Sequence, residues 1–266
     1  MDNKIFADML SEVRAKRPLV HHITNYVTVN DCANVTICIG ASPVMAHAKG
    51  EVAEMAAMAG ALVLNIGTLD EAQVGSMLLA GARANSLGIP VILDPVGAGA
   101  TGLRTESARR LLRDLDIAVL KGNAAEIATL AGAEGSIKGV DSYGIKGEPL
   151  DIARALAKKM NRVVAISGAT DIVTDGKRTM LVDNGHPLMG RVSGTGCMAA
   201  SMAGAFAAVA KDHVAASAAA FAAFGLAGEK AARHCEGPAS FKVALLDEVY
   251  NLTPGELEKG ARVRVA

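Results

Sequence analysis

Nearly continuous apolar runs alternate with longer helix-like segments along most of this 266-residue chain. The runs Ala61–Ile66, Pro90–Asp94 and Ile117–Leu120 are typical of strands that are buried on both faces of a parallel sheet. Segments of about ten residues or more with helical character follow them, which indicates βαβ units. The sequence therefore predicts an α/β fold of three layers, in which helices flank a mainly parallel sheet.

Helix boundaries are predicted from capping residues and glycines. Thr68 and Thr105 are each expected to cap a helix, and a long alanine-rich helix is expected from Met198 to Ala210. The segment Gly132–Gly147 has the composition of a loop, and the charged C-terminal tail is expected to lie at the edge of the fold. Because no second core or linker is visible, residues 1–266 are predicted to form a single domain.

Composition excludes several classes of function. Lys and Arg together number 27, as do Asp and Glu, so a general affinity for nucleic acid or for anionic membranes is not expected. The uncharged segment Val192–Ala210 consists largely of Ala, Gly, Ser and Met, which gain little in lipid, so no membrane span is predicted. The four cysteines form no C-x-x-C pair, and the N-terminus does not resemble a signal peptide; both features predict a cytoplasmic protein.

Polar residues stand where several predicted strands end. In parallel sheets ligands bind beyond the carboxyl ends of the strands. Asp94, Lys121 and Ser167 fall at such ends, and Asn25 follows another predicted strand. We therefore expect these residues, which are distant in sequence, to meet in one crevice.

The stretch Gly190–Ala200 combines glycines with the predicted start of a helix. Such a start offers unpaired amide groups and a partial positive charge, which suit a phosphate or a developing anion. Cys197 lies at this end, where the helix dipole is expected to favour its thiolate form. The alternative is an ordinary helix start, capped by Thr195, with glycines that serve only packing.

Asp94 and Glu126 are carboxylates at the ends of adjacent βα units, where they could hold Mg²⁺ together with its waters. Purely structural roles, in a turn and in a first helical turn, are the alternative. The run Gly97–Gly102 matches a dinucleotide-binding pattern by letter, but the carboxylate of Asp94 beside it disfavours a pyrophosphate without a cation. A flexible loop beside a metal-dependent site is the preferred interpretation.

Six short motifs occur in a single order that is highly specific. The motifs are His22–Asn25, Ser42–Met45, Asn65–Thr68, Asp94–Ala98, Lys121–Glu126 and Gly194–Cys197. Over roughly Lys16 to Arg233 the chain resembles the hydroxyethylthiazole kinase family of the ribokinase-like superfamily. The resemblance implies a ribokinase-like fold and ATP-dependent phosphorylation of 4-methyl-5-(2-hydroxyethyl)thiazole, a step of thiamine salvage. It also implies Mg²⁺ and a homotrimer with sites near the subunit contacts.

The resemblance also implies roles for individual residues. Met45 and Gly194 would contact the thiazole with Asn25 close by, Lys121 and Ser167 would contact ATP, and Asp94 and Glu126 would lie at the metal and phosphates. Sugar kinases of the superfamily usually carry Asp where this chain has Cys197, so Cys197 would lie beside the substrate hydroxyl and act as a modest catalytic base, with a packing role as the alternative. Cys197 and Asp94 are thus the predicted catalytic residues.

No insertion is long enough for the strand lid that those sugar kinases often carry, so a neighbouring subunit could provide cover. Two alternatives remain. One is a related kinase that acts on hydroxymethylpyrimidine or pyridoxal, and the other is a nucleotide-binding regulatory protein without turnover.

Overall fold

A computed structural model of the chain describes residues 2–132 and 148–266. Its strands form one sheet in the order β2-β1-β3-β4-β5-β6-β7-β8-β9. The pairs from β2 to β6 are parallel, and the pairs from β6 to β9 are antiparallel. The strands are β1 Leu19–Ile23, β2 Ser42–Val44, β3 Ala61–Asn65, β4 Val91–Asp94, β5 Val119–Asn123, β6 Val163–Ser167, β7 Asp171–Thr174, β8 Thr179–Val182 and β9 Val263–Val265.

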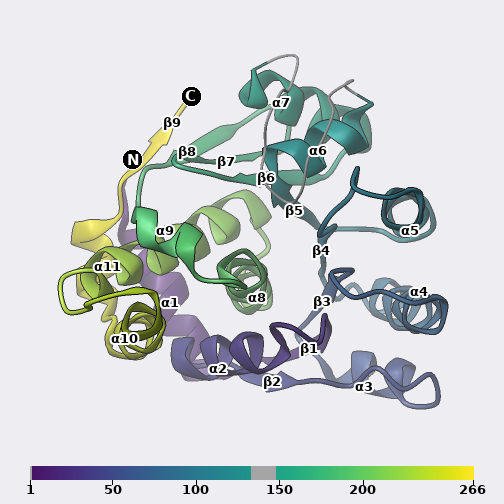
Figure 1. Cartoon of the computed structure of the whole chain (residues 1–266), viewed down its shortest axis with the longest axis horizontal. Coiled ribbons are helices and arrows are strands. Elements are labelled where there is room, and N and C mark those ends of the chain that lie inside the picture. Colours follow the sequence, from purple (N-terminus) through teal and green to yellow (C-terminus); the bar gives the residue numbers. More distant parts are fainter. Residues whose placement is uncertain (1, 133–147) are drawn as a thin grey trace.

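Helices cover both faces of this sheet (Figure 1). One layer contains α1 Lys4–Lys16, α2 Val29–Ile39, α8 Thr195–Ala207, α9 His213–Ala231, α10 Pro238–Asn251 and α11 Pro254–Gly260, and a short 3-10 helix, Pro187–Arg191, precedes α8. The other layer contains α3 Val52–Met58, α4 Glu71–Ser86, α5 Gly102–Asp114, α6 Ala124–Ala131 and α7 Pro149–Met160. The predicted three-layer α/β fold with a mainly parallel sheet is confirmed, and every strand of the described residues belongs to the one sheet.

The alanine-rich helices α8 and α9 form part of the buried core. They pack against each other and against the sheet, and small side chains make the close approach possible. A Cβ atom added to Gly204 of α8 would lie 2.6 Å from Cγ2 of Val63 in β3, so this helix lies directly on the sheet. Among the described residues no helix is long and apolar enough to cross a membrane.

Several boundaries differ from the expectations. Asp70, rather than Thr68, caps α4 through its side chain, and Thr101, rather than Thr105, caps α5. Helix α8 begins three residues before Met198, because Gly194 occupies the N-cap position. The tail is not only an edge segment, since it forms α11 and the strand β9, which pairs with β8.

The edge strand β2 was not predicted, because Pro43 and the three-residue length hide its pattern. Except for Gly132, the expected loop Gly132–Gly147 lies outside the described residues.

Candidate functional site

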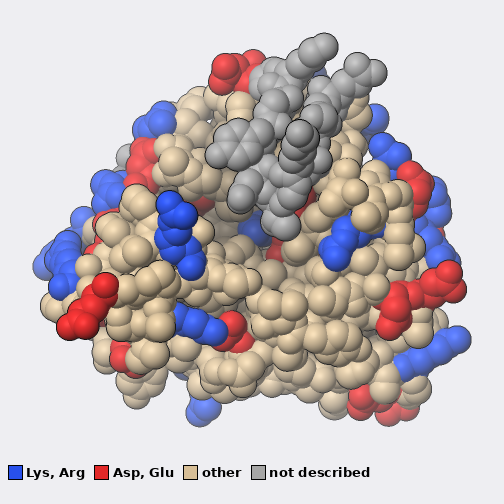
Figure 2. All heavy atoms as spheres, viewed as in Figure 1, with Lys and Arg blue, Asp and Glu red and all other residues tan. Residues whose placement is uncertain are grey.

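The predicted polar residues come together where the parallel strands reach their carboxyl ends. Asn65 and Asp94 end β3 and β4 and are direct partners in the sheet register. Lys121 lies in the neighbouring strand β5, and Asn25 follows β1 by two residues. The molecular surface is hollowed near the centre of the face shown in Figure 2, with both acidic and basic atoms at the bottom of the hollow.

A chain of buried hydrogen bonds links three of these side chains. Asn25 Nδ2 donates to Asn65 Oδ1 at 2.9 Å, and Asn65 Nδ2 donates to Asp94 Oδ2 at 2.7 Å. The three residues are 3%, 1% and 1% exposed, respectively. Asn65 belongs to one of the six sequence motifs but is not among the predicted site residues. Its place at a strand end, level with Asp94, was the signal that could have identified it.

Cys197, in the first turn of α8, closes this chain. Its Sγ accepts from Asn65 Nδ2 at 3.2 Å and from Asn25 Nδ2 at 3.4 Å. Burial, and then the carboxylate of Asp94, raise the pKa of the Cys197 thiol above its ordinary value. This direction is opposite to the predicted thiolate, because burial and a neighbouring negative charge both disfavour the charged form of the thiol.

Lys121 brings a buried positive charge to the same place. Its Nζ lies 3.7 Å from Asp94 Oδ1 and donates to the Gly196 carbonyl at 3.0 Å. Burial opposes the charge of Lys121, but the carboxylates of Asp94 and Glu126 leave its pKa raised, so it stays cationic. Burial raises the pKa of Asp94 to about 7, although Lys121 acts in the opposite direction. Asp94 can thus exchange a proton near neutral pH.

Glu126 connects two loops of the site. Its Oε1 accepts from the backbone N–H of Gly97 at 2.8 Å, and its Oε2 accepts from that of Asn123 at 2.8 Å. The Asn123 side chain in turn accepts from Glu126 N, which completes a capping box at the start of α6. The carboxylate thereby holds the β4–α5 loop against the start of α6.

Arg104 of α5 is a site-supporting residue that sequence reasoning missed. Its guanidinium donates to the carbonyls of Gly67 and Val96, both at 2.8 Å, and to that of Ile66 at 3.3 Å. With Glu126 it holds the Gly97–Gly102 loop, which was expected to be flexible. No sequence motif could have identified Arg104, because its partners are backbone carbonyls, which every residue type has.

Gly194 and Asn25, both predicted to contact substrate, meet through Thr28. The backbone of Gly194 has a φ of +94°, and a Cβ atom there would lie 2.6 Å from Thr28 Cγ2. Asn25 Oδ1 accepts from both the backbone N–H of Thr28 at 3.0 Å and its hydroxyl at 3.1 Å. The start of α8 therefore rests directly on the turn that carries Asn25.

Met45 and Ser167 also lie at the carboxyl ends of the parallel strands, on opposite sides of the Asp94–Lys121 pair. Met45 follows β2 directly, and Ser167 ends β6, where its hydroxyl reaches the Gly122 carbonyl at 3.5 Å. Both residues are half-buried. Hydrogen bonds and an ion pair connect Asn25, Asp94 and Lys121 with the start of α8. Met45 and Ser167 make none of these contacts, and they lie near the others because β2 and β6 end on the same side of the sheet.

The residues fit a magnesium ion that arrives with phosphates rather than a protein-only metal cage. No group of three or more His, Cys, Asp or Glu side chains suitable for a metal occurs among the described residues. Two carboxylates beside a buried lysine match the preference of Mg²⁺ for few protein ligands, retained waters and phosphate oxygens. Each carboxylate oxygen of Glu126 accepts one N–H and keeps acceptor capacity for a water.

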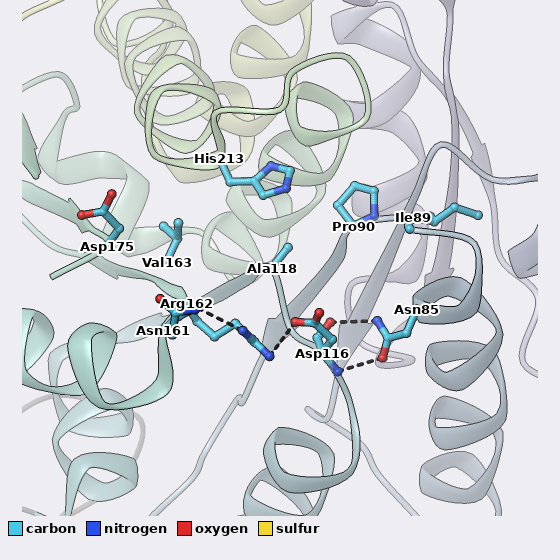
Figure 3. A pocket seen from close by; sticks show the side chains of 11 residues that line it. Asn85, Ile89, Pro90, Asp116, Ala118, Asn161, Arg162, Val163, Asp175 and His213 are labelled. Carbon is cyan, nitrogen blue, oxygen red and sulfur yellow. Dashed lines mark hydrogen bonds and ion pairs between the residues drawn. The ribbon is translucent and has the colours of Figure 1, made fainter. Parts of the chain in front are cut away.

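A cavity of about 330 Å³ lies at the opposite edge of the sheet, where β4, β5 and β6 begin (Figure 3). Its polar lining groups largely pair with one another. Arg162 bonds Asp116 at 2.7 Å, and Asn85 exchanges two hydrogen bonds with the backbone of Asp116. Because it lacks the converging charges found at the carboxyl ends of the strands, this cavity is not the candidate active site.

Comparisons with known proteins agree with this geometry. The profile of the hydroxyethylthiazole kinase family matches residues 10–255. A protein named hydroxyethylthiazole kinase from Methanocella arvoryzae is 70% identical over 266 residues, which cover 100% of both chains. The solved structure of a hydroxyethylthiazole kinase protein from Pyrococcus horikoshii is 43% identical, with a TM-score of 0.90 and 99% of each chain covered.

A more distant structure shares the fold alone. The Bacillus subtilis pyridoxal kinase in complex with ADP is 16% identical, with a TM-score of 0.60 over 80% of this chain and 92% of that chain.

Proposed function

The chain belongs to the hydroxyethylthiazole kinase family, and we propose that it transfers the γ-phosphoryl group of ATP to the hydroxyl of 4-methyl-5-(2-hydroxyethyl)thiazole. This reaction is a step of thiamine salvage. The observation that carries the proposal is the convergence of Asp94, Lys121 and Cys197 at the start of α8. In the reaction a bond forms between the alcohol oxygen and phosphorus, the bond to the ADP oxygen breaks, and the alcohol proton is released.

Asp94 would receive that proton. Its carboxylate lies beside Lys121 at the start of α8, and a carboxylate can act as a general base. The hydrogen bond from Asn65 orients the carboxylate, and Asn25 orients Asn65 in turn. Cys197 would lie beside the alcohol and shape its position, and the raised pKa of its thiol favours the protonated form, which cannot accept the alcohol proton.

Positive groups would stabilise the charge that spreads over the transferred phosphoryl oxygens. Lys121 supplies a buried cation, and the first-turn amides of α8 lack partners within the helix. Ser167 would contact ATP from the end of β6. Asp94 and Glu126 would hold the Mg²⁺ that accompanies ATP, and the bound ion would neutralise part of the phosphate charge.

The alcohol would bind on the side of the Asp94–Lys121 pair that faces away from Ser167, between Met45, Gly194 and Asn25. Tyr26 and Val27, next to Asn25, are 60% and 69% exposed, which supports cover by a neighbouring subunit. The assembly would be a homotrimer, as in the family that the sequence resembles. The reaction would take place in the cytoplasm. Light scattering that finds an active monomer would contradict the assembly.

An ADP-release assay over a small panel of alcohols tests the function. With ATP and Mg²⁺, turnover is expected on hydroxyethylthiazole and should exceed that on hydroxymethylpyrimidine and pyridoxal. Equal or faster turnover on hydroxymethylpyrimidine would overturn the substrate assignment. A protein that binds ATP but releases no ADP with any alcohol would be a regulatory protein rather than a kinase.

A further inference from the structure

His21 is a buried histidine of β1 that the proposed mechanism leaves without a role. Its side chain is fully buried, and its Nε2 lies 2.7 Å from the backbone carbonyl of Ala46. Burial lowers the pKa of His21, so the ring is neutral at physiological pH and carries one N–H. A carbonyl oxygen can only accept, so that hydrogen lies on Nε2, which donates to Ala46.

Only one ring nitrogen of His21 has a partner in the described part of the chain. Nδ1 is buried and has no hydrogen-bond partner among the described residues. The contact that the ring makes with the protein backbone is therefore the Nε2–H bond to Ala46, and a leucine in its place would leave that carbonyl without a donor.

The hydrogen bond from His21 to Ala46 holds the segment that directly follows β2. Strand β2 lies at the edge of the sheet and comprises only Ser42–Val44, so its pairing with β1 ends at His21 and Val44. In the described part of the chain, the Ala48 carbonyl accepts from the backbone N–H groups of Glu51 and Val52, and two further contacts hold the segment before it. His21 binds Ala46, and the His47 ring meets that of Tyr26 edge-on with centroids 6.3 Å apart. Tyr26 directly follows Asn25, so both contacts keep the segment after β2 beside the Asn25 turn.

We propose that His21 is a positioning residue for the alcohol side of the site, which holds the Ala46 carbonyl and thereby fixes Met45 beside Asn25. The inference rests on the proposed function, in which Met45 contacts the alcohol. His21 itself touches no reactant. Its loss should therefore weaken binding of the alcohol without affecting binding of ATP, which belongs to the opposite side of the centre.

Two variants of His21 separate this role from a purely structural one. His21→Leu removes the donor, and His21→Gln can place an amide N–H near the position of Nε2. We expect His21→Leu to raise the KM for the alcohol about tenfold, the usual scale for one lost hydrogen bond. The KM for ATP should change less than about twofold, and His21→Gln should recover most of the loss.

Thr174→Val is the control. It removes the buried hydrogen bond from Thr174 Oγ1 to Arg178 O at 2.8 Å, and with it the contacts of the same hydroxyl with Gly176 N and Thr179 Oγ1, in β7 opposite Val164 near the start of β6. It should alter neither KM. Equal effects of His21→Leu on both KM values, no effect on either, or a failure of His21→Gln to do better would overturn the proposal.

Hydrogen exchange separates this proposal from the proposed function. In substrate-free protein, the backbone amides of Glu51 and Val52, which donate to the Ala48 carbonyl, should exchange about tenfold faster in His21→Leu than in the parent or His21→Gln, because the segment that carries this carbonyl loses an anchoring bond. Unchanged exchange would reject the anchoring role even if the protein is a thiazole kinase. If the parent protein fails to phosphorylate the thiazole but the exchange pattern holds, the substrate assignment fails and the anchoring role stands.

Discussion

Lys121 and Asp94 form a buried ion pair in which each charge compensates the other. Replacing Lys121 by Met would leave a buried carboxylate without its cation, which costs about 3–5 kcal/mol when the carboxylate stays charged. We expect Lys121→Met to lower kcat/KM for ATP at least about a hundredfold, whereas Lys121→Arg should stay within about tenfold because it retains the charge. Steady-state kinetics and thermal denaturation of both variants provide the measurement, and an unchanged KM for ATP in Lys121→Met would argue against a phosphate contact.

Cys197 can be tested through the two N–H groups that point at its sulfur. Alanine would leave one amide hydrogen of Asn25 and one of Asn65 without an acceptor, whereas serine or aspartate can accept both. We expect the order of kcat to be Cys197→Asp equal to or above the parent, then Cys197→Ser, with Cys197→Ala lowest but still active. Rates measured at saturating ATP decide the matter. Equal rates in all four proteins would reduce Cys197 to a packing residue, and an inactive but folded, ATP-binding Cys197→Asp would reject its place beside the hydroxyl.

At the scale of elements, the start of α8 depends on contact between Gly194 and the turn before α2. Gly194→Ala would place a non-glycine residue in the left-handed backbone region, which costs about 1–2 kcal/mol. Its Cβ atom would also clash with Thr28 Cγ2. We expect this variant to lose thermal stability and to raise the KM for the alcohol. Thr28→Ser removes that methyl group and keeps the hydroxyl bound to Asn25, so the double variant should recover part of the loss. A double variant no better than Gly194→Ala would show that backbone strain alone is responsible.

The loop between β4 and α5 shows where sequence reasoning ends. Its glycines, and the carboxylates of Asp94 and Glu126 around it, could be located from the alternation of strands and helices. The hold of Arg104 on three carbonyls could not, because backbone acceptors are the same in every sequence. For Glu126 the sequence left open a metal ligand or a structural role in the first turn of a helix, and its bonds to the backbone N–H groups of Gly97 and Asn123 could not be predicted, because backbone donors carry no residue type either.

At the scale of the whole molecule, Asp171 couples stability to pH. Burial raises its pKa from 3.8 to about 7, with Lys121 acting in the opposite direction. Its contribution to the free energy of unfolding is therefore fully present below about pH 4 and is lost as the pH rises through 7. Between pH 5 and pH 8 the parent should lose on the order of 1 kcal/mol relative to Asp171→Asn.

Urea denaturation at several pH values measures this difference. Asp175→Asn is the control, because hydrogen bonds from the backbone around Arg178 outweigh burial and lower the pKa of Asp175 below its ordinary value. Because this pKa is lowered, Asp175 should leave the slope between pH 5 and pH 8 unchanged. If Asp171→Asn also left that slope unchanged, Asp171 would be ionised throughout the range.

The parallel half of the sheet was predictable and its two edges were not. Strands such as Ala61–Asn65 and Val91–Asp94 carry their own apolar pattern, and because they are parallel they bring Asn65 and Asp94 to one edge. The edge strands β2 and β9 are three residues each and exist through pairing with a neighbour, which no local pattern encodes. The ionisation state of Cys197 was missed for a similar reason, since burial depends on elements that are distant in sequence.

The close contact of Gly204 with Val63 bears on how relatives of this protein can acquire new acceptor alcohols. Helix α8 cannot be tilted or shifted without disturbing the sheet beneath it, so the end that carries Gly194 and Cys197 is held in one position. The segment after β2 lies at the rim, where the His21 bond, one ring contact and the amides that bond the Ala48 carbonyl hold it. Substrate preference should therefore be easier to change by substitutions in residues 45–48 and in their anchors than by substitutions at the start of α8.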